Sequence, residues 1–339
     1  MGRGLGVLVV LLLCGTISCR RPEPETGKQA PSVPPQATLA DRSQQPTGQE
    51  PRAAAGEAAL LPWLEEVGAG YKTESSGRII LIDLSRPPES ETPAVEEGHL
   101  RAIGSLEGLR SLKLTGQPIT DSSLDHLRGL SRLKALGLDD TSVGDAGLEK
   151  LAALARLEEL FLTRTAVTDA GLRWLAKLPR LRRLRLRGTA VTDVGLAALA
   201  EIPTLEDIDL SETGVGDTGM EALARLPRLA RLNLWTTKVT DQGLSHLSRI
   251  TSLVWLNLDN TLVSDAGLPH LASLKGLRFL HLGRTRITDA GVEALVVLRE
   301  LGELHVTNTA VTQTGVEKLQ KGLPDTKIHF GATGPPRAS

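Results

Sequence analysis

The sequence repeats itself every 24 residues from Leu109 onward, and this period limits the chain to a narrow class of folds. Two consecutive units, residues 157–180 and 181–204, read LEELFLTRTAVTDAGLRWLAKLPR and LRRLRLRGTAVTDVGLAALAEIPT. Nine such units fill residues 109–324, and each begins with leucine. A period of roughly 20 to 29 residues with leucines spaced L-x-x-L-x-L is typical of solenoids, in which each unit stacks on its neighbours.

Each unit contains one strand pattern followed by one helix pattern. In LEELFL, alternation places Leu160 and Leu162 on one face of a short strand, and Glu159 and Phe161 on the other. In GLRWLAKL, leucines recur at helical spacing. Neither apolar edge can be buried within one unit, so neighbouring units must cover each other. The pattern predicts an α/β solenoid with a curved parallel sheet on the concave face and short helices on the convex face.

The repeated motif L-x-x-L-x-L-x-x-T-x-V-T-D-x-G-L resembles that of bacterial leucine-rich repeat proteins. The resemblance extends over about residues 79–330 and implies the horseshoe-shaped solenoid of that family. It is specific for the fold, whereas function in this family varies among many binding roles.

The ends of the solenoid need covers, because a terminal unit would otherwise expose its apolar edge. Ala58–Val67 predicts an amphipathic helix that places Leu61, Trp63, Leu64 and Val67 over the first repeat. The segments expected around the nine repeats are an N-terminal capping region (57–78), an atypical first repeat (79–108), a terminal capping strand (325–330) and a disordered tail (331–339).

Residues 1–18 are predicted to be an export signal. A positive charge precedes the apolar run Leu5–Cys14, which is too short to span a bilayer and has the length of a signal-peptide core. Thr16–Cys19 resembles a bacterial lipobox, although Thr16 departs from the leucine that the pattern prefers, and the resemblance implies lipidation of Cys19. Ordinary secretion with an incidental cysteine is the alternative.

Residues 20–56 carry seven prolines and few bulky apolar side chains. Such a segment cannot bury enough surface to offset the entropy of ordering, so it predicts a disordered linker. A lipid on Cys19 and this linker together predict display in the cell envelope. We expect the folded part to be anchored to a membrane, the outer membrane being favoured, and to face the periplasm or the exterior.

Composition excludes several classes of function. The net charge is −1, with 39 Lys and Arg against 40 Asp and Glu, which argues against nucleic-acid binding through phosphate neutralisation. The two cysteines, Cys14 and Cys19, precede the repeats, which therefore lack disulfides, a thiolate nucleophile and a cysteine zinc site. No nucleophile elbow, phosphate-binding loop or dinucleotide motif occurs, so we expect neither an enzyme nor a cofactor. Capped sheet edges predict a monomer.

A Thr-Asp-x-Gly turn precedes the helix of most units. Its aspartate recurs at positions 121, 145, 169, 193, 217, 241, 265 and 289. Calcium-binding repeats differ, because they recur at about nine residues and gather oxygens from adjacent turns. We interpret the threonine and aspartate as caps of helix N–H groups, and Gly171 and its equivalents as a tight entry. Thr165 and its equivalents are predicted to hydrogen-bond the backbone at the bend after each strand.

Function is sought at the outward strand positions, because the leucines are committed to the core. The third position of successive units carries charges of alternating sign about 4.8 Å apart, at Glu159, Arg183, Asp207 and Arg231. At the fifth position, Arg185 can pair with Asp209. These residues form either a charged recognition groove or a self-neutralising ladder, and the alternation favours the ladder.

Four of the eight aromatic residues occupy outward positions: Phe161, Trp235, Trp255 and Phe279. The last three are expected on consecutive strands, and an exposed apolar patch with polar neighbours commonly marks a binding site. Alternatively, Trp255 stacks on Phe279 and covers Arg231 only to stabilise the sheet. The predicted binding surface on the concave face comprises Arg231, Asn233, Trp235, Trp255, Asn257, Phe279, His281 and His305.

Three histidines, His281, His305 and His329, share the fifth position of adjacent strands. Imidazoles in a row are candidate ligands of a transition metal, and an open position would allow hydrolytic chemistry. Because no carboxylate accompanies them in that column, the sequence does not favour a metal site.

The sequence favours a non-enzymatic protein–protein interaction module that acts through the concave face of the later repeats. Tryptophan, asparagine and aspartate also suit sugar rings, so a glycan or cell-wall ligand is one alternative. A passive structural envelope lipoprotein without a defined pocket is another.

Overall fold

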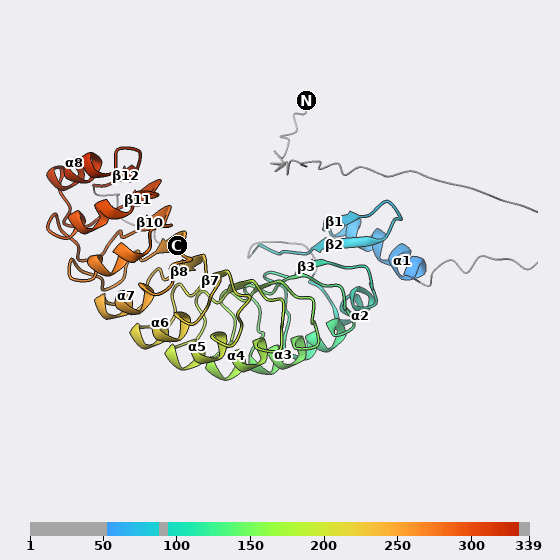
Figure 1. The fold of residues 1–339 in the computed structure, drawn as a ribbon. Coiled ribbons are helices and arrows are strands. Elements are labelled where there is room, and N and C mark those ends of the chain that lie inside the picture. The colour runs from blue at the N-terminus through green and yellow to red at the C-terminus, as the bar shows by residue number, and fades with distance from the viewer. Residues whose placement is uncertain (1–52, 88–93, 332–339) are drawn as a thin grey trace, which may run out of the picture. The chain divides into compact units, whose positions relative to one another are not determined.

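The computed structural model describes residues 53–87 and 94–331, which fall in one compact unit spanning residues 49–339. The predicted signal peptide, Cys19, most of the predicted linker and residues 332–339 of the predicted tail lie outside the described residues. The repeats form a curved coil with strands along its inner side and helices along its outer side (Figure 1). In this part of the chain, no helix is both long enough and apolar enough to cross a membrane.

Twelve strands of the described part form one sheet, and their order in the sheet follows their order in the chain. β1 and β2 are antiparallel, and each later neighbouring pair is parallel. The strands are β1 (Gly70–Thr73), β2 (Ile79–Asp83), β3 (Ser111–Lys113), β4 (Ala135–Gly137), β5 (Glu159–Phe161), β6 (Arg183–Arg185), β7 (Asp207–Asp209), β8 (Arg231–Asn233), β9 (Trp255–Asn257), β10 (Phe279–His281), β11 (Glu303–His305) and β12 (Lys327–His329).

Short helices connect the strands on the outer side of the coil. Three of them are 3₁₀ helices: η1 (Ser122–Leu127), η2 (Leu268–Ser273) and η3 (Val292–Val297). The α-helices are α1 (Ala53–Glu66), α2 (Glu97–Gly104), α3 (Asp145–Leu151), α4 (Asp169–Leu175), α5 (Asp193–Leu199), α6 (Asp217–Leu223), α7 (Asp241–Leu247) and α8 (Gln313–Gly322). The predicted solenoid, with its sheet on the concave face and its helices on the convex face, is confirmed.

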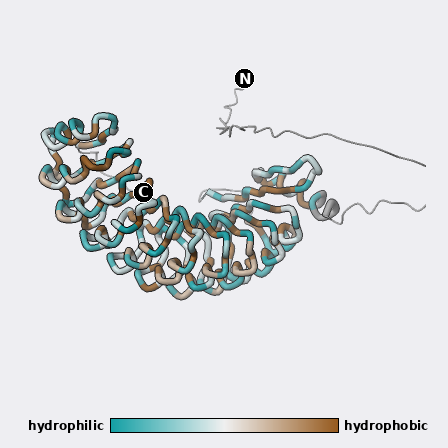
Figure 2. Tube along the Cα trace, viewed as in Figure 1, coloured by the Kyte–Doolittle hydropathy of each residue, from teal (hydrophilic) through white to brown (hydrophobic). Residues whose placement is uncertain are grey.

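The repeated leucines form a continuous core between the sheet and the helices. Leu160 and Leu162 of one unit are fully buried, as are Leu172 and Leu175 of its helix. Apolar segments accordingly recur in every turn of the coil (Figure 2). At the bend after the strand, the Thr165 hydroxyl donates to the Leu162 carbonyl at 2.8 Å, as predicted, and the same bond recurs in seven other repeats. The first of the nine repeats carries Gln117 at this position instead, and its amide donates to the Leu84 carbonyl.

The Thr-Asp turn joins consecutive repeats as well as capping helices. The Thr168 hydroxyl accepts a hydrogen bond from Ala170 N at 3.3 Å and so caps α4, as predicted. The aspartate reaches elsewhere: Asp145 Oδ1 accepts from Thr168 N at 2.8 Å, in the following repeat. A Cβ on Gly171 would lie 2.4 Å from Asp145 Oδ1, so glycine is required for this close approach. The prediction that the aspartate caps its own helix is therefore wrong.

The first repeat is preceded by a helix and a hairpin. α1 begins at Ala53, so residues 53–56, which were predicted to belong to the linker, are helical. Leu64 of α1 is fully buried, and Trp63 stacks on His99 of α2 with ring centroids 4.0 Å apart. β1 pairs antiparallel with β2, a hairpin that the repeat pattern does not reveal.

Candidate functional site

The later strands bring an aromatic row to the concave face. Trp255 of β9 stands opposite Phe279 of β10 in the parallel register, and their rings stack 4.9 Å apart at an interplanar angle of 7°. The Arg231 guanidinium of β8 lies 4.7 Å from the centre of the Trp255 ring. At the other end, the Phe279 and His305 rings are 5.4 Å apart. These four residues, here called the aromatic row, form a contiguous line of ring and guanidinium contacts across four strands.

The three histidines form a second stack beside the aromatic row. His281 and His305 rings are 4.6 Å apart, and His305 and His329 rings are 4.1 Å apart and nearly parallel. Gly283 N donates to His281 Nδ1 at 3.2 Å, which leaves the ring proton of neutral His281 on Nε2. Burial is the main cause that lowers the pKa of His281 to about 4, so this ring is neutral at physiological pH.

A carboxylate reaches the histidine stack from outside the column of fifth positions, a contact that the column pattern does not predict. Glu303 Oε1 lies 2.9 Å from His305 Nε2 and 3.0 Å from His329 Nε2. Glu303 occupies the third position of its unit, outside the column of fifth positions. Because residues two apart in a strand share a face, the segment Glu303–Leu304–His305 contained the signal for this contact.

Trp235 does not belong to the aromatic row. It lies two residues after the end of β8, and the Arg187 guanidinium lies 4.8 Å from its ring centre. Arg187 in turn donates to Glu212 at 2.9 and 3.1 Å, and this bond lowers the pKa of the Glu212 carboxyl. The Trp235 indole N–H is buried and makes no hydrogen bond among the described residues. The prediction that Trp235, Trp255 and Phe279 lie on three consecutive strands is therefore wrong for Trp235.

The predicted asparagines hold the backbone at the ends of their strands. Asn233 Oδ1 accepts from Trp235 N at 3.2 Å, and Asn257 Oδ1 accepts from Asp259 N at 2.9 Å. His281 Nδ1 makes the same contact two residues ahead. A side-chain acceptor at the fifth position therefore satisfies a backbone N–H as the chain leaves the sheet.

The charges of the earlier repeats neutralise one another. Arg183 lies 3.0 Å from Glu159 and 3.3 Å from Asp207, while Arg231 lies 3.6 Å from Asp207. Arg185 pairs with Asp207 at 2.7 Å, so its predicted pairing with Asp209 is wrong. Burial would lower the pKa of Arg185, but the Asp207 hydrogen bonds and nearby carboxylates raise it above its ordinary value. This part of the face is a charge ladder.

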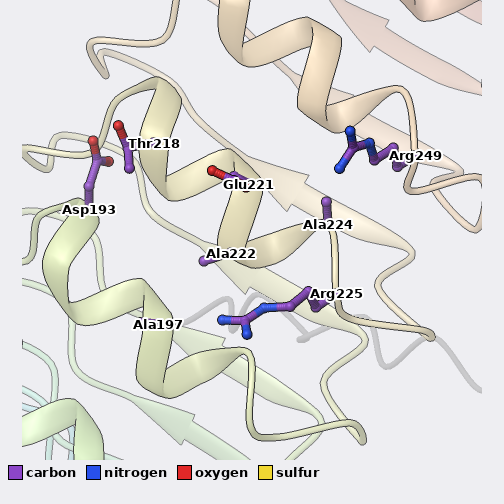
Figure 3. Close-up of a pocket in the computed structure, with 8 residues that line it drawn as sticks. All are labelled: Asp193, Ala197, Thr218, Glu221, Ala222, Ala224, Arg225 and Arg249. Carbon is purple, nitrogen blue, oxygen red and sulfur yellow. The ribbon is translucent and has the colours of Figure 1, made fainter.

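Two of the hollows among the described residues lie on opposite sides of the coil. On the concave side, a cavity of about 350 Å³ adjoins the histidine stack, and Asp259, Arg284 and Asn308 contribute to its lining. On the helical side, a cavity of about 470 Å³ lies along α5 and α6 (Figure 3). Asp193 on its rim already accepts from Gly216 N at 2.6 Å, so it serves the repeat-to-repeat contact. The concave hollow is lined by three histidines beside Asp259 and Arg284, whereas none of the described histidines lines the hollow on the helical side.

A family model described as Leucine Rich repeat matches residues 177–200, 201–224 and 277–296. Among solved structures, internalin C2 from Listeria monocytogenes is 25% identical, with 62% of this chain and 84% of that chain covered and a TM-score of 0.48. No curated protein matches the chain in sequence.

Two receptors show the same fold at lower identity. The Arabidopsis receptor kinase HAESA ectodomain, solved with an N-terminally extended IDA peptide hormone, is 15% identical over 76% of this chain and 46% of its own, with a TM-score of 0.56. A TDR receptor is 15% identical over 70% of this chain and 46% of its own, with a TM-score of 0.50. The chain thus spans just under half of each receptor. Together with the 12-stranded sheet of the described residues, these matches show that the chain folds as a leucine-rich repeat solenoid.

Proposed function

We propose that the concave face of the later repeats binds a protein or peptide partner and performs no catalysis. The aromatic row is the observation that carries this proposal. Tryptophan and arginine are enriched in binding hot spots, and rings held by the sheet register lose little freedom on binding. A peptide hormone is the ligand of the HAESA ectodomain, whose fold is similar.

The packing of Trp255 favours a polypeptide over a glycan. Arg231 belongs to β8 and Phe279 to β10, and these strands flank β9 on either side. Both faces of the Trp255 ring are therefore covered, and the ring offers its edge to a ligand. A sugar that stacks on an aromatic face would have to displace one of these neighbours, whereas side chains of a protein partner can pack against ring edges and the guanidinium.

Affinity capture with the full chain tests this proposal. Trp255→Ala together with Phe279→Ala should lower partner recovery from envelope extract at least tenfold. The stack contributes only about 0.5–1.5 kcal/mol beyond its area burial. For a chain of this size, each kcal/mol shifts Tm by roughly 2–4 °C. Both rings are half-buried, so their removal also loses some area burial, but the leucine core stays intact and the double variant should stay folded, as circular dichroism would show.

Matched aromatic substitutions separate this surface from others. Phe161→Ala removes an outward ring from β5, and Trp174→Ala removes a half-buried ring from the helical side, so both should retain capture. Trp235→Ala tests whether the binding surface extends past β8. Equal recovery with Trp255→Ala/Phe279→Ala would refute the proposed site. Recovery that survives protease treatment of the extract would instead identify a glycan ligand.

We also propose that the protein is lipid-anchored in the cell envelope. The apolar run Leu5–Cys14 and the lipobox-like segment Thr16–Cys19 support this proposal. Cys19→Ser should move the protein from the membrane fraction to the soluble fraction on cell fractionation. A Cys19→Ser protein that stays in the membrane fraction would contradict lipid anchoring.

A further inference from the structure

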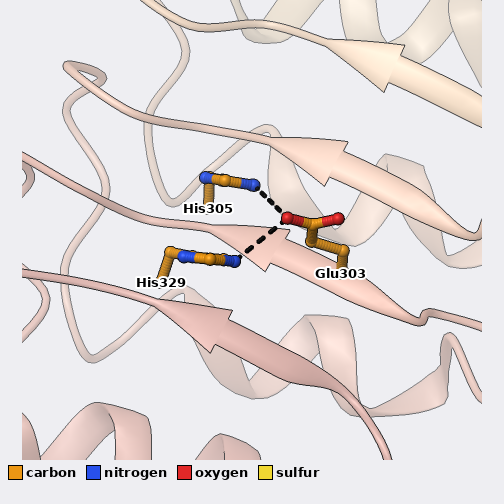
Figure 4. A group of neighbouring side chains, drawn as sticks. All are labelled: Glu303, His305 and His329. Atoms are coloured by element: carbon orange, nitrogen blue, oxygen red, sulfur yellow. Dashed lines mark hydrogen bonds and ion pairs between the residues drawn. The ribbon is translucent and has the colours of Figure 1, made fainter. Parts of the chain in front are cut away.

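Three potential metal ligands converge at the last two strands of the sheet. Glu303 and His305 project from the same face of β11, and His329 of β12 stands opposite His305 in the parallel register. Both imidazoles point toward the same carboxylate (Figure 4). One ligand atom from each of the three residues lies within 4.8 Å of the other two.

The hydrogen bonds within this group leave one of its ligand atoms without a proper partner. His329 Nε2 is buried and makes no well-formed hydrogen bond, although it lies 3.0 Å from Glu303 Oε1. The same oxygen is shared with His305 Nε2 at 2.9 Å. A cation placed among the three side chains would be bound by both nitrogen lone pairs and by the carboxylate at once. A buried polar atom without a proper partner is costly, so the binding of a cation would relieve an existing penalty.

We propose that Glu303, His305 and His329 bind a divalent transition-metal ion, with Zn²⁺ as the best match. Two imidazoles and one carboxylate form a common zinc ligand set, with metal–nitrogen distances of about 2.0–2.1 Å. Tetrahedral geometry then requires donor atoms roughly 3.4 Å apart. Since the three donors now lie within 4.8 Å, small rotations of these half-buried side chains supply the remaining closure. The ion needs no movement of the backbone.

His281 is excluded from this ligand set although it continues the stack. Its Nδ1 already accepts the Gly283 N–H, and its Nε2 carries the ring proton, so neither nitrogen offers a free lone pair to a metal ion. Three protein ligands leave a fourth position open, as in zinc sites that exchange a ligand. The ligand His305 is itself in ring contact with Phe279, so the site adjoins the aromatic row. A carboxylate or imidazole of a bound partner could occupy it.

The surroundings allow an ion to enter. Glu303 is 40% exposed and His329 31% exposed at the side chain, so an ion can reach the site past the carboxylate although His329 Nε2 itself is buried. Lys327 stands opposite Glu303 in the register, but it is solvent-exposed and its repulsion is screened. Arg284 is paired with Asp259, which offsets its charge. The group is therefore accessible without being dominated by positive charge.

Calorimetric titration of the untagged full chain with ZnCl₂ tests the site. We expect one Zn²⁺ per chain with a dissociation constant in the micromolar range or below. Glu303→Gln, which preserves side-chain shape, should weaken binding at least tenfold, as should His305→Ala and His329→Ala. Co²⁺ should give visible d–d absorption with the wild type, and this absorption should be lost in the same variants.

Two matched histidine substitutions serve as controls. His281→Ala lies next in the stack, and His270→Ala lies on η2, away from the sheet; both should bind Zn²⁺ within twofold of wild type. Circular dichroism on each variant would detect loosening of β12. No saturable uptake by the wild type would overturn the proposal. So would uptake that survives in the His305→Ala/His329→Ala double variant, or an equal loss with His281→Ala.

Discussion

At the eighth position of most repeats, the backbone takes a left-handed conformation with a residue other than glycine. Thr236 has φ of 55° and Asn260 also 55°, whereas Gly188 fills the equivalent position with φ of 65°. Asparagine tolerates this region, but a β-branched residue there is a genuine outlier. Charged residues at this position can offset the strain: Arg164, for example, pairs with Asp140 of the preceding repeat through two hydrogen bonds.

Replacing Thr236 with glycine should therefore stabilise the protein. The left-handed conformation costs roughly 1–2 kcal/mol for a residue with a Cβ. Thr236→Gly also loses a hydrogen bond from Asn260 at 3.0 Å and raises the entropy of the unfolded chain, so the net gain should be at most about 1 kcal/mol. Gly188→Thr is the reverse substitution and should lose a similar amount. Chemical denaturation of both variants measures this, and a destabilised Thr236→Gly would contradict the strain interpretation.

The sequence predicts residues of the site best where the strand register alone places them. Trp255 and Phe279 share the third position, so the 24-residue period put them side by side. Trp235 follows the strand, where the chain leaves the sheet. Strand alternation therefore no longer predicts which way its side chain points. Arg185 likewise reaches Asp207 diagonally, a choice that depends on side-chain length and rotamer rather than on position.

Among structural elements, the helix-entry turns link consecutive repeats through hydrogen bonds to an aspartate, and each such link is called a tie here. Asp217 at the start of α6 accepts hydrogen bonds from Thr240 N at 2.8 Å, Gly243 N at 2.9 Å and the Thr240 hydroxyl at 2.7 Å. One carboxylate thus satisfies three donors at the entry to α7. The repeated aspartate was visible in the sequence, but its reach into the next repeat was not, because pattern analysis reads each unit separately.

Removing one such carboxylate should weaken the coil markedly. Asp217→Ala leaves partly buried N–H groups without an acceptor, which costs about 1–3 kcal/mol. At roughly 2–4 °C per kcal/mol, Tm should fall by several degrees. Glu221→Ala changes an exposed carboxylate on the same helix and should leave Tm nearly unchanged. If thermal unfolding of the two variants coincided, the tie would have no energetic role.

The last of these ties predicts acid sensitivity at α8. Hydrogen bonds from the Thr312 side chain and backbone are the main causes that lower the pKa of Asp289. A carboxyl with a lower pKa in the folded state stabilises fully above its unfolded pKa of about 3.9, and this contribution disappears as pH falls through the folded value. Wild-type stability should therefore fall more steeply below about pH 4 than that of Asp289→Asn. Parallel pH profiles in denaturant titrations would contradict this.

For the whole molecule, the ends are built differently from the repeats between them. The buried leucines of α1 made the N-terminal helix predictable, although not its start at Ala53. β1 was not predictable, because its side chains are almost all exposed and carry no apolar pattern. At the other end, the strand predicted over 325–330 corresponds to β12 (Lys327–His329), which pairs in register with β11.

Loss of β12 should destabilise the coil from its C-terminal end. Val306 N donates to the His329 carbonyl at 2.8 Å, and Lys327 N donates to the Gly302 carbonyl at 2.9 Å. A chain ending at Pro324 would leave Val306 N and the Gly302 carbonyl, which flank β11, unpaired, and an open sheet edge promotes self-association. Because solenoid repeats contact only their neighbours, hydrogen exchange should rise first near β11 and least near β5. Light scattering should detect oligomers of this truncation, while a chain ending at Gly331 should match wild type. Equal behaviour of the two truncations would show that β12 is dispensable as a cap.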